Sequence, residues 1–117
     1  MEKEGIHEYF QVDVNQFPHN NSQTGKLMHQ FTFHEDGHGG LVKKIRYDKG
    51  TIIPWHWHHC GHGFYVLEGT LETNQGSYKP GDFVWFDAKT KQWHGAGDKE
   101  DAVVLFVTDS PCDMNYL

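Results

Sequence analysis

Short alternating or apolar runs of strand length, separated by turn-forming residues, dominate the chain. Apolar side chains recur at every second position in the earlier runs, a period that is typical of strands with one buried face. Turn signals lie at Asn74-Gln75-Gly76 and at Pro80-Gly81-Asp82. The predicted strands are residues 27–35, 41–47, 52–58, 64–73, 77–79, 83–86 and 102–108. This spacing predicts an all-β protein, either a sandwich or a barrel.

The two ends of the chain have weaker patterns. Residues 1–26 form an N-terminal arm, in which residues 9–14 suit an edge strand or a segment that reaches a second subunit. The polar residues 19–22 predict a loop, and residues 110–117 predict an irregular tail. No window of helical length carries an apolar stripe with a period of about 3.6 residues. The arrangement therefore predicts strands and turns throughout.

Length and composition narrow the class of protein. The 117 residues are 37% hydrophobic and 22% charged, which favours a single folded domain over residues 1–117 rather than a disordered chain. The net charge of −6 argues against nucleic acid or an anionic membrane as a partner. No apolar run reaches about 18 residues, so we expect no membrane span. Without a signal peptide, and with two cysteines, a cytoplasmic location is expected.

Histidine is the unusual feature of the composition. There are ten histidines, and four of them lie within residues 56–62. On a strand, His56 and His58 point the same way, and His62 opens the next strand after a turn at Cys60-Gly61. A barrel brings the distant His94 to the same centre. Imidazole is the commonest transition-metal ligand, so this pattern favours a metal site over ordinary surface histidines.

Other histidines and the nearby thiol have simpler interpretations. His59 points to the opposite face of its strand from His58, and we interpret it as a surface residue or a neighbour of the ligands. Cys60 lies in the predicted turn and is interpreted as a loop thiol rather than a soft ligand. The remaining histidines, which we expect to be solvated or hydrogen-bonded, are His7, His19, His29, His34 and His38.

This spacing resembles a known family of proteins. Gly50, His56, His58, His62 and Gly69 resemble the first cupin motif, with the usual glutamate replaced by His62. The turn at residues 80–82 resembles the start of the second cupin motif, and His94 resembles its histidine. The resemblance covers residues 39–109, which we expect to form the barrel core.

The resemblance to cupins implies a fold and a cofactor. The implied fold is a double-stranded β-helix, a jelly-roll-like barrel, and many cupins are dimers, so a homodimer is expected. The implied cofactor is a divalent transition metal (Fe, Mn, Zn, Ni, Co or Cu) held by His56, His58, His62 and His94. The change from glutamate to His62 resembles a four-histidine subgroup that includes cupin dioxygenases and polyketide cyclases.

The ligand set predicts the type of substrate. Four neutral imidazoles leave the metal with its full 2+ charge, which favours an anionic small molecule such as an enolate. We therefore expect a dioxygenase acting on a small enolisable or aromatic oxygenated molecule. A redox-neutral cyclase or isomerase, and a non-catalytic metal- or small-molecule-binding domain, are the alternatives. The residues expected to line the substrate pocket are Phe64, Val66, Trp85, Trp93 and Phe106.

Overall fold

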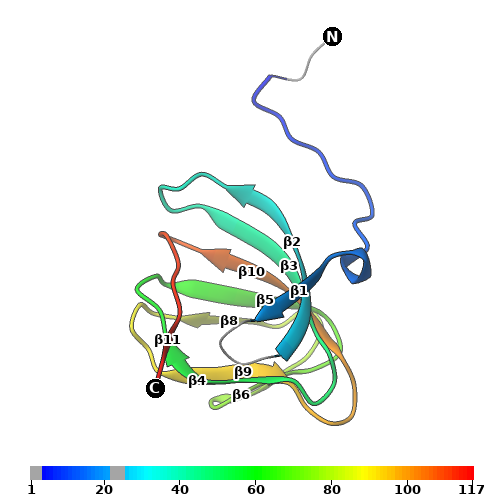
Figure 1. Ribbon diagram of the computed structural model, residues 1–117, viewed down its shortest axis with the longest axis vertical. Helices are drawn as coiled ribbons and strands as arrows, with labels where there is room; N and C mark the ends of the chain where they lie inside the picture. The colour runs from blue at the N-terminus through cyan, green and yellow to red at the C-terminus, as the bar shows by residue number, and fades with distance from the viewer. Residues whose placement is uncertain (1–3, 22–25) are drawn as a thin grey trace.

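Two antiparallel β-sheets form the protein (Figure 1). The computed structural model describes residues 4–21 and 26–117. The six-stranded sheet has the order β1 (Pro18–Asn21), β2 (Lys26–Glu35), β3 (Leu41–Tyr47), β10 (Ala102–Thr108), β5 (His62–Glu68) and β8 (Phe83–Phe86). The five-stranded sheet has the order β11 (Asn115–Tyr116), β4 (Ile52–Trp57), β9 (Gln92–Ala96), β6 (Leu71–Thr73) and β7 (Gly76–Tyr78). One 3-10 turn, η1 (Val14–Gln16), precedes β1. The prediction of an all-β, jelly-roll-like barrel is confirmed.

The hydrophobic core lies between the two sheets. Phe64, Val66 and Val104 come from the six-stranded sheet, and Ile53 and Leu71 come from the five-stranded sheet. All five side chains are buried, and burial of each large apolar side chain contributes about 1.5–3 kcal/mol. The inward-facing positions alternate with outward-facing ones, as a pleated strand requires. This packing holds the two histidine-bearing strands of the smaller sheet against β5.

The predicted bounds of three strands agree with the structure: residues 41–47, 83–86 and 102–108. The predicted strand 64–73 is wrong, because it is two strands, β5 and β6, in different sheets. The chain leaves β5 at Gly69, whose φ is +71°, a conformation that side chains other than glycine rarely adopt. A Cβ atom there lies 1.9 Å from the backbone oxygen of Asp101, so the crossing between the sheets also needs a glycine for space.

Three strands were not predicted, namely β1, β9 and β11. Residues 19–22 were expected to be a loop, but Pro18–Asn21 pairs with β2 as β1, and Ser22 lies outside the described residues. Strand β9 carries the sequence Gln-Trp-His-Gly-Ala, which has no clear alternation of apolar residues. It forms because β4 and β6 supply hydrogen bonds on both sides. Tertiary pairing, rather than local propensity, defines β1 and β9.

Residues 4–13 extend away from the barrel, and the chain reaches the barrel at η1 (Figure 1). Tyr9 packs edge-to-face against Phe31 and Phe33 of β2, with ring centroids 5.4 Å apart in both pairs. The aromatic face of β2 therefore points outward, toward the arm, while Met28 on its other face is buried. Residues 9–14 are not a strand in this structure, and contact of the arm with a second subunit stays a prediction.

The C-terminal segment, residues 109–117, connects the two sheets. It begins at the end of β10 in the larger sheet and ends in β11, which pairs with β4 in the smaller sheet (Figure 1). Asn115 pairs with Trp57 and Tyr116 pairs with His56. The predicted irregular tail thus contains a two-residue strand, and it lies beside the histidine-bearing end of β4.

Candidate metal centre

Four histidines gather inside the barrel at the end where the C-terminal segment crosses. His56 belongs to β4, His58 follows it directly, His62 begins β5 and His94 lies in the middle of β9. None of the four is more than 5% exposed. A β-bulge between Ile53 and His56 turns the end of β4 so that both of its histidines point inward. Strand pairing therefore brings together residues that lie up to 38 positions apart.

His56 and His94 face each other directly. Their Nε2 atoms are 3.1 Å apart, and the Nδ1–H of His56 donates to the backbone carbonyl of Pro54 at 2.6 Å. That bond leaves the Nε2 lone pair of His56 free. Two nitrogens bound to one ion at about 2.1 Å are separated by about 3.0 Å at right angles and about 3.4 Å at the tetrahedral angle. The observed separation therefore suits two ligands of one metal ion.

His58 is the third member of this cluster. One ligand nitrogen from each of His56, His58 and His94 lies within 4.8 Å of the others. The Nδ1–H of His58 donates to the backbone carbonyl of Asp113, which leaves Nε2 as the nitrogen with a free lone pair. A carbonyl bonded to the far nitrogen is the usual support of a metal-binding imidazole, because it fixes both the tautomer and the ring orientation.

Burial keeps these three imidazoles neutral. It lowers the pKa of His58 to about 4, although the bond to Asp113 partly opposes this change and nearby His62 and His56 add to it. Burial likewise lowers the pKa of His56 and, more strongly, that of His94. Metal ions bind the neutral form of histidine, so the site holds its ligands ready at neutral pH.

His62 lies next to the three clustered histidines but is not part of that group. Its ring centroid is 4.5 Å from that of His58, and its ring stacks on Phe86 at 5.5 Å. Its Nε2–H donates to the side-chain oxygen of Gln92 at 2.9 Å, while its buried Nδ1 has no hydrogen-bond partner. The structure therefore brings three of the four predicted ligands together and places the fourth beside them.

Sequence reasoning did not identify Gln92. The signal was available, because Gln92 lies two residues before His94 on the same strand and so faces the same way. Its side chain is fully buried and bonds to His62. A buried amide that fixes an imidazole without a charge fits a site whose ligands are all neutral.

The residues present fit a transition metal. Three neutral imidazoles converge, and backbone carbonyls hold the Nδ1–H groups of His56 and His58, so the Nε2 lone pairs of these two rings are available inside the cluster. Buried polar atoms normally have partners, so free lone pairs at this point indicate that a further group belongs there. Nitrogen donors of this kind bind Mn, Fe, Co, Ni, Cu and Zn.

A cavity of about 270 Å³ adjoins the histidine cluster. His58 and His94 form part of its wall, and most of the remaining wall is apolar. The lining residues include Phe106, Tyr47, Ile53, Met28 and Lys43. Burial raises the pKa of Tyr47 far above its usual value, so this phenol stays protonated. Lys43 adds a cation, and Asp113 a carboxylate, to the residues that line an otherwise largely apolar cavity.

The predicted pocket residues divide into three groups. Phe106 lines the cavity. Phe64 and Val66 are fully buried in the core, where Phe64 packs against His94 with ring centroids 4.8 Å apart. Trp85 and Trp93 do not line the cavity: Trp85 is exposed on β8, and Trp93 lines a shallow groove on the outer face of the smaller sheet. Their neighbours point inward, so strand alternation directs both indoles outward.

The fold and the buried histidine cluster together define a cupin, as the sequence motif predicted. The chain belongs to the family of ChrR cupin-like domains, which matches residues 7–113. No curated protein matches the chain.

Solved structures share the fold at low sequence identity. A chain of the complex of Rhodobacter sphaeroides SigE with the anti-sigma ChrR matches 70% of this chain, with a TM-score of 0.62 and 21% identity. The match spans 45% of that chain, so this protein corresponds to less than half of it. The polyketide cyclase RemF from Streptomyces resistomycificus gives a TM-score of 0.70 and 12% identity, covering 94% of this chain and 86% of its own. A cupin-like protein from Thermotoga maritima gives a TM-score of 0.68 and 20% identity. The match covers 96% of this chain and 87% of that protein.

Proposed function

We propose that the protein is a metal-dependent cupin enzyme, a dioxygenase that acts on a small enolisable or aromatic oxygenated molecule. One observation carries this proposal: the buried imidazoles of His56, His58 and His94 converge at the wall of a mainly apolar cavity. Metal ligands that border a cavity leave room for a small molecule beside the ion, which is the arrangement of catalytic rather than structural metal sites.

His56, His58 and His94 hold the metal, and His62 is the fourth ligand once it exchanges its bond with Gln92 for the ion. The metal is one of Fe, Mn, Zn, Ni, Co or Cu. When bound, it supplies a Lewis acid with its full 2+ charge, and Fe or Mn adds redox chemistry with O₂. The backbone carbonyls of Pro54 and Asp113 keep two of the rings oriented.

The cavity favours a small anionic substrate. Its volume of about 270 Å³ lies at the small end of the range for ligand pockets, about 300–1,000 Å³. Lys43 attracts a negative charge, and the neutral imidazoles do not repel one. The carboxylate of Asp113, which also belongs to the lining residues, is bonded to the backbone N–H of His59. Phe106 and Ile53 exclude water from the wall, which strengthens this attraction. A substrate that binds as its enolate needs no strong general base from the protein.

Metal content and oxygen uptake test the proposal. Protein purified under native conditions is expected to contain one equivalent of a divalent metal. His58→Ala and His94→Ala should lose it, whereas His38→Ala, on an exposed turn, should keep it. Full metal retention in both cluster variants would refute the site.

The reaction type is tested by reconstitution. Forms loaded with Fe²⁺, Mn²⁺ and Zn²⁺ are assayed with an oxygen electrode against β-dicarbonyls and diphenols. Oxygen uptake by the Fe or Mn form supports the dioxygenase. Conversion without O₂ by the zinc form rejects it in favour of a cyclase or isomerase, the reaction class to which RemF belongs by name.

A regulatory ligand-binding domain is the second candidate function. The family match supports it, because ChrR is described as an anti-sigma factor in complex with SigE. In that case the cavity binds a small molecule and changes no bond in it. Calorimetric binding of a diphenol or β-dicarbonyl, with no turnover by any metal form, favours this second function over the enzyme.

A homodimer and a cytoplasmic location stay predictions. Over residues 4–21 and 26–117 the structure contains no helix long and apolar enough to cross a membrane. Sedimentation equilibrium of the full chain measures the oligomeric state, and a mass of one chain at all concentrations contradicts the homodimer.

A further inference from the structure

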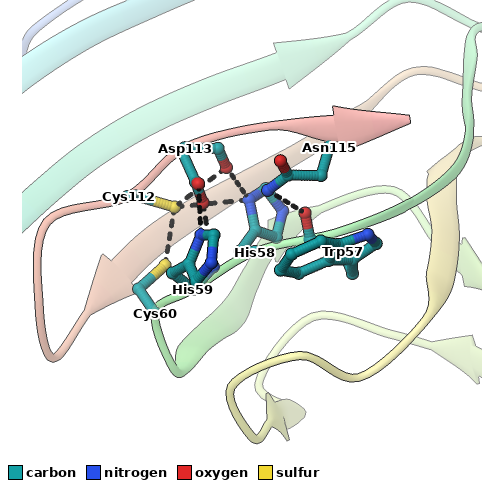
Figure 2. Close-up of polar contacts among 7 residues, drawn as sticks. All are labelled: Trp57, His58, His59, Cys60, Cys112, Asp113 and Asn115. Carbon is teal, nitrogen blue, oxygen red and sulfur yellow. Dashed lines mark hydrogen bonds and ion pairs between the residues drawn. The ribbon is translucent and has the colours of Figure 1, made fainter. Parts of the chain in front are cut away.

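The two cysteines of the chain meet beside the metal centre. Cys60 follows the end of β4 and Cys112 lies in the C-terminal segment, 52 residues later. Their Sγ atoms are 2.6 Å apart, compared with about 2.05 Å in a disulfide bond. Figure 2 shows the two sulfurs facing each other, with the sulfur of Cys112 also in contact with the ring of His58. Cys60 is fully buried and Cys112 is partly exposed, so one thiol is accessible and its partner is protected.

The surrounding contacts join the C-terminal segment to the histidine-bearing chain. Asp113 accepts a hydrogen bond from His58 through its backbone carbonyl, and its carboxylate accepts one from the backbone N–H of His59 at 2.8 Å (Figure 2). The side chain of Asn115 donates to the carbonyl of Trp57 at 3.2 Å. All these contacts lie within a few residues of Cys112. A covalent bond at Cys112 therefore fixes the groups that orient His58.

We infer that Cys60 and Cys112 form a reversible disulfide that fastens residues 109–117 across the histidine end of the barrel. The disulfide bond holds Asp113 in place. When the bond is reduced, only weak polar contacts hold this residue. Cys112 also lines the cavity beside the histidines, so the bond fixes part of the cavity wall. This inference concerns the thiols alone and does not depend on the metal.

A soft metal ion is the competing use of the same atoms, since Cys60, Cys112 and a ring nitrogen of His58 lie within 4.8 Å of one another. The geometry favours the disulfide. The Nδ1 of His58, which is 3.4 Å from the sulfur of Cys112, carries the proton that it donates to Asp113. Only the two thiols then remain as ligands, fewer than the four of a structural zinc site.

The reaction is a thiol–disulfide exchange with a low-molecular-weight disulfide such as oxidised glutathione. The accessible thiol of Cys112 gives up its proton and attacks one sulfur of the oxidant, and the first glutathione thiolate leaves with that proton. The thiolate of Cys60 then attacks the sulfur of Cys112 and expels the second glutathione. Two protein thiols are oxidised to one disulfide, the oxidant is reduced to two thiols, and the two protons pass from the protein thiols to the released glutathione.

The experiment uses the full chain, freed of metal with a chelator, reduced, and then equilibrated with oxidised and reduced glutathione. The expected product contains no titratable thiol, carries no glutathione, and is about 2 Da lighter than the reduced protein. Cys60→Ser should instead keep glutathione on Cys112. In the oxidised wild type, amide hydrogen exchange in residues 109–117 should slow at least about tenfold, because local opening of the segment is restrained.

Two results overturn the inference. One is a wild-type protein that accumulates as a glutathione adduct, or as disulfide-linked dimers, without an internal bond. The other is an internal bond that leaves the exchange of residues 109–117 unchanged. Both are read on the wild type in its two redox states, so neither depends on whether a variant folds. Failure to bind a metal affects neither result.

Discussion

Acidification should destabilise the metal-free protein well above the pH at which carboxylates titrate. His58 has its pKa lowered to about 4 by burial, whereas in the unfolded chain the same group titrates near its ordinary value of 6.5. Below pH 6.5 the unfolded state therefore binds more protons than the folded state. The free energy of unfolding then falls as the pH falls, from about 6.5 down to about 4, and this group adds no further change below that.

The loss in the free energy of unfolding can be calculated from the change in the pKa of His58. Each pKa unit corresponds to about 1.36 kcal/mol, so the full shift at His58 gives roughly 3 kcal/mol. Relaxation and water entry around a charged imidazole reduce this to about 2–3 kcal/mol. His56 and His94 have pKa values lowered in the same direction and add to it. A small domain is stable by about 5–15 kcal/mol, so the loss is a large fraction of the total.

Urea unfolding in the presence of a chelator measures this dependence between about pH 7.5 and about pH 4.5. Two carboxylates with lowered pKa values lose their contribution at a lower pH than this window. Asp36 and Asp113 have pKa values lowered by hydrogen bonds from backbone N–H groups, and their stabilisation is lost only below their ordinary value of 3.8. The thiol of Cys60, whose pKa is lowered to about 6 mainly by its contact with Cys112, also titrates in the upper part of the window. The decrease between about pH 6 and about pH 4.5 is therefore the part that reports on the imidazoles.

His58→Gln removes one titrating ring and should flatten the pH dependence, whereas His38→Gln, on an exposed turn, should leave it unchanged. The reasoning is refuted if the free energy of unfolding of the metal-free wild type stays constant within about 0.5 kcal/mol across the window. It is also refuted if His58→Gln retains the whole slope.

Three further predictions test the metal linkage, the crossing between the sheets and the support of the fourth histidine. Thermal midpoints with and without chelator should differ at neutral pH and converge as the pH falls from about 6.5 to about 5, because protons displace the metal; an equal difference at about pH 4.5 contradicts this. Gly69→Ala should lower the free energy of unfolding by at least about 2 kcal/mol more than Gly37→Ala. Both glycines have similar positive φ angles, but only at Gly69 does a Cβ meet the backbone of Asp101. Equal losses in urea titrations contradict this prediction. Gln92→Leu should lower the free energy of unfolding of the metal-free protein by about 1–3 kcal/mol, because it leaves His62 without its hydrogen-bond partner. The loss should be smaller in the metal-loaded protein. An identical loss in both forms argues against His62 as a ligand.

The local pattern of the sequence was sufficient to predict the class of fold and part of the site. Alternation over residues 41–47, and the apolar runs 83–86 and 102–108, predicted strands that the structure confirms, because a buried strand face imposes its period on neighbouring residues. The same period made His56 and His58 point the same way. These inferences succeed because they depend only on residues a few positions apart.

Pairings between distant residues were decided by the tertiary structure alone. Strand β9 has no apolar alternation of its own, yet its register against β4 brings His94 to within 3.1 Å of His56. The meeting of Cys60 with Cys112 depends on where the C-terminal segment crosses between the sheets. No local pattern encodes such contacts, because they result from packing and hydrogen bonding of the whole barrel at once.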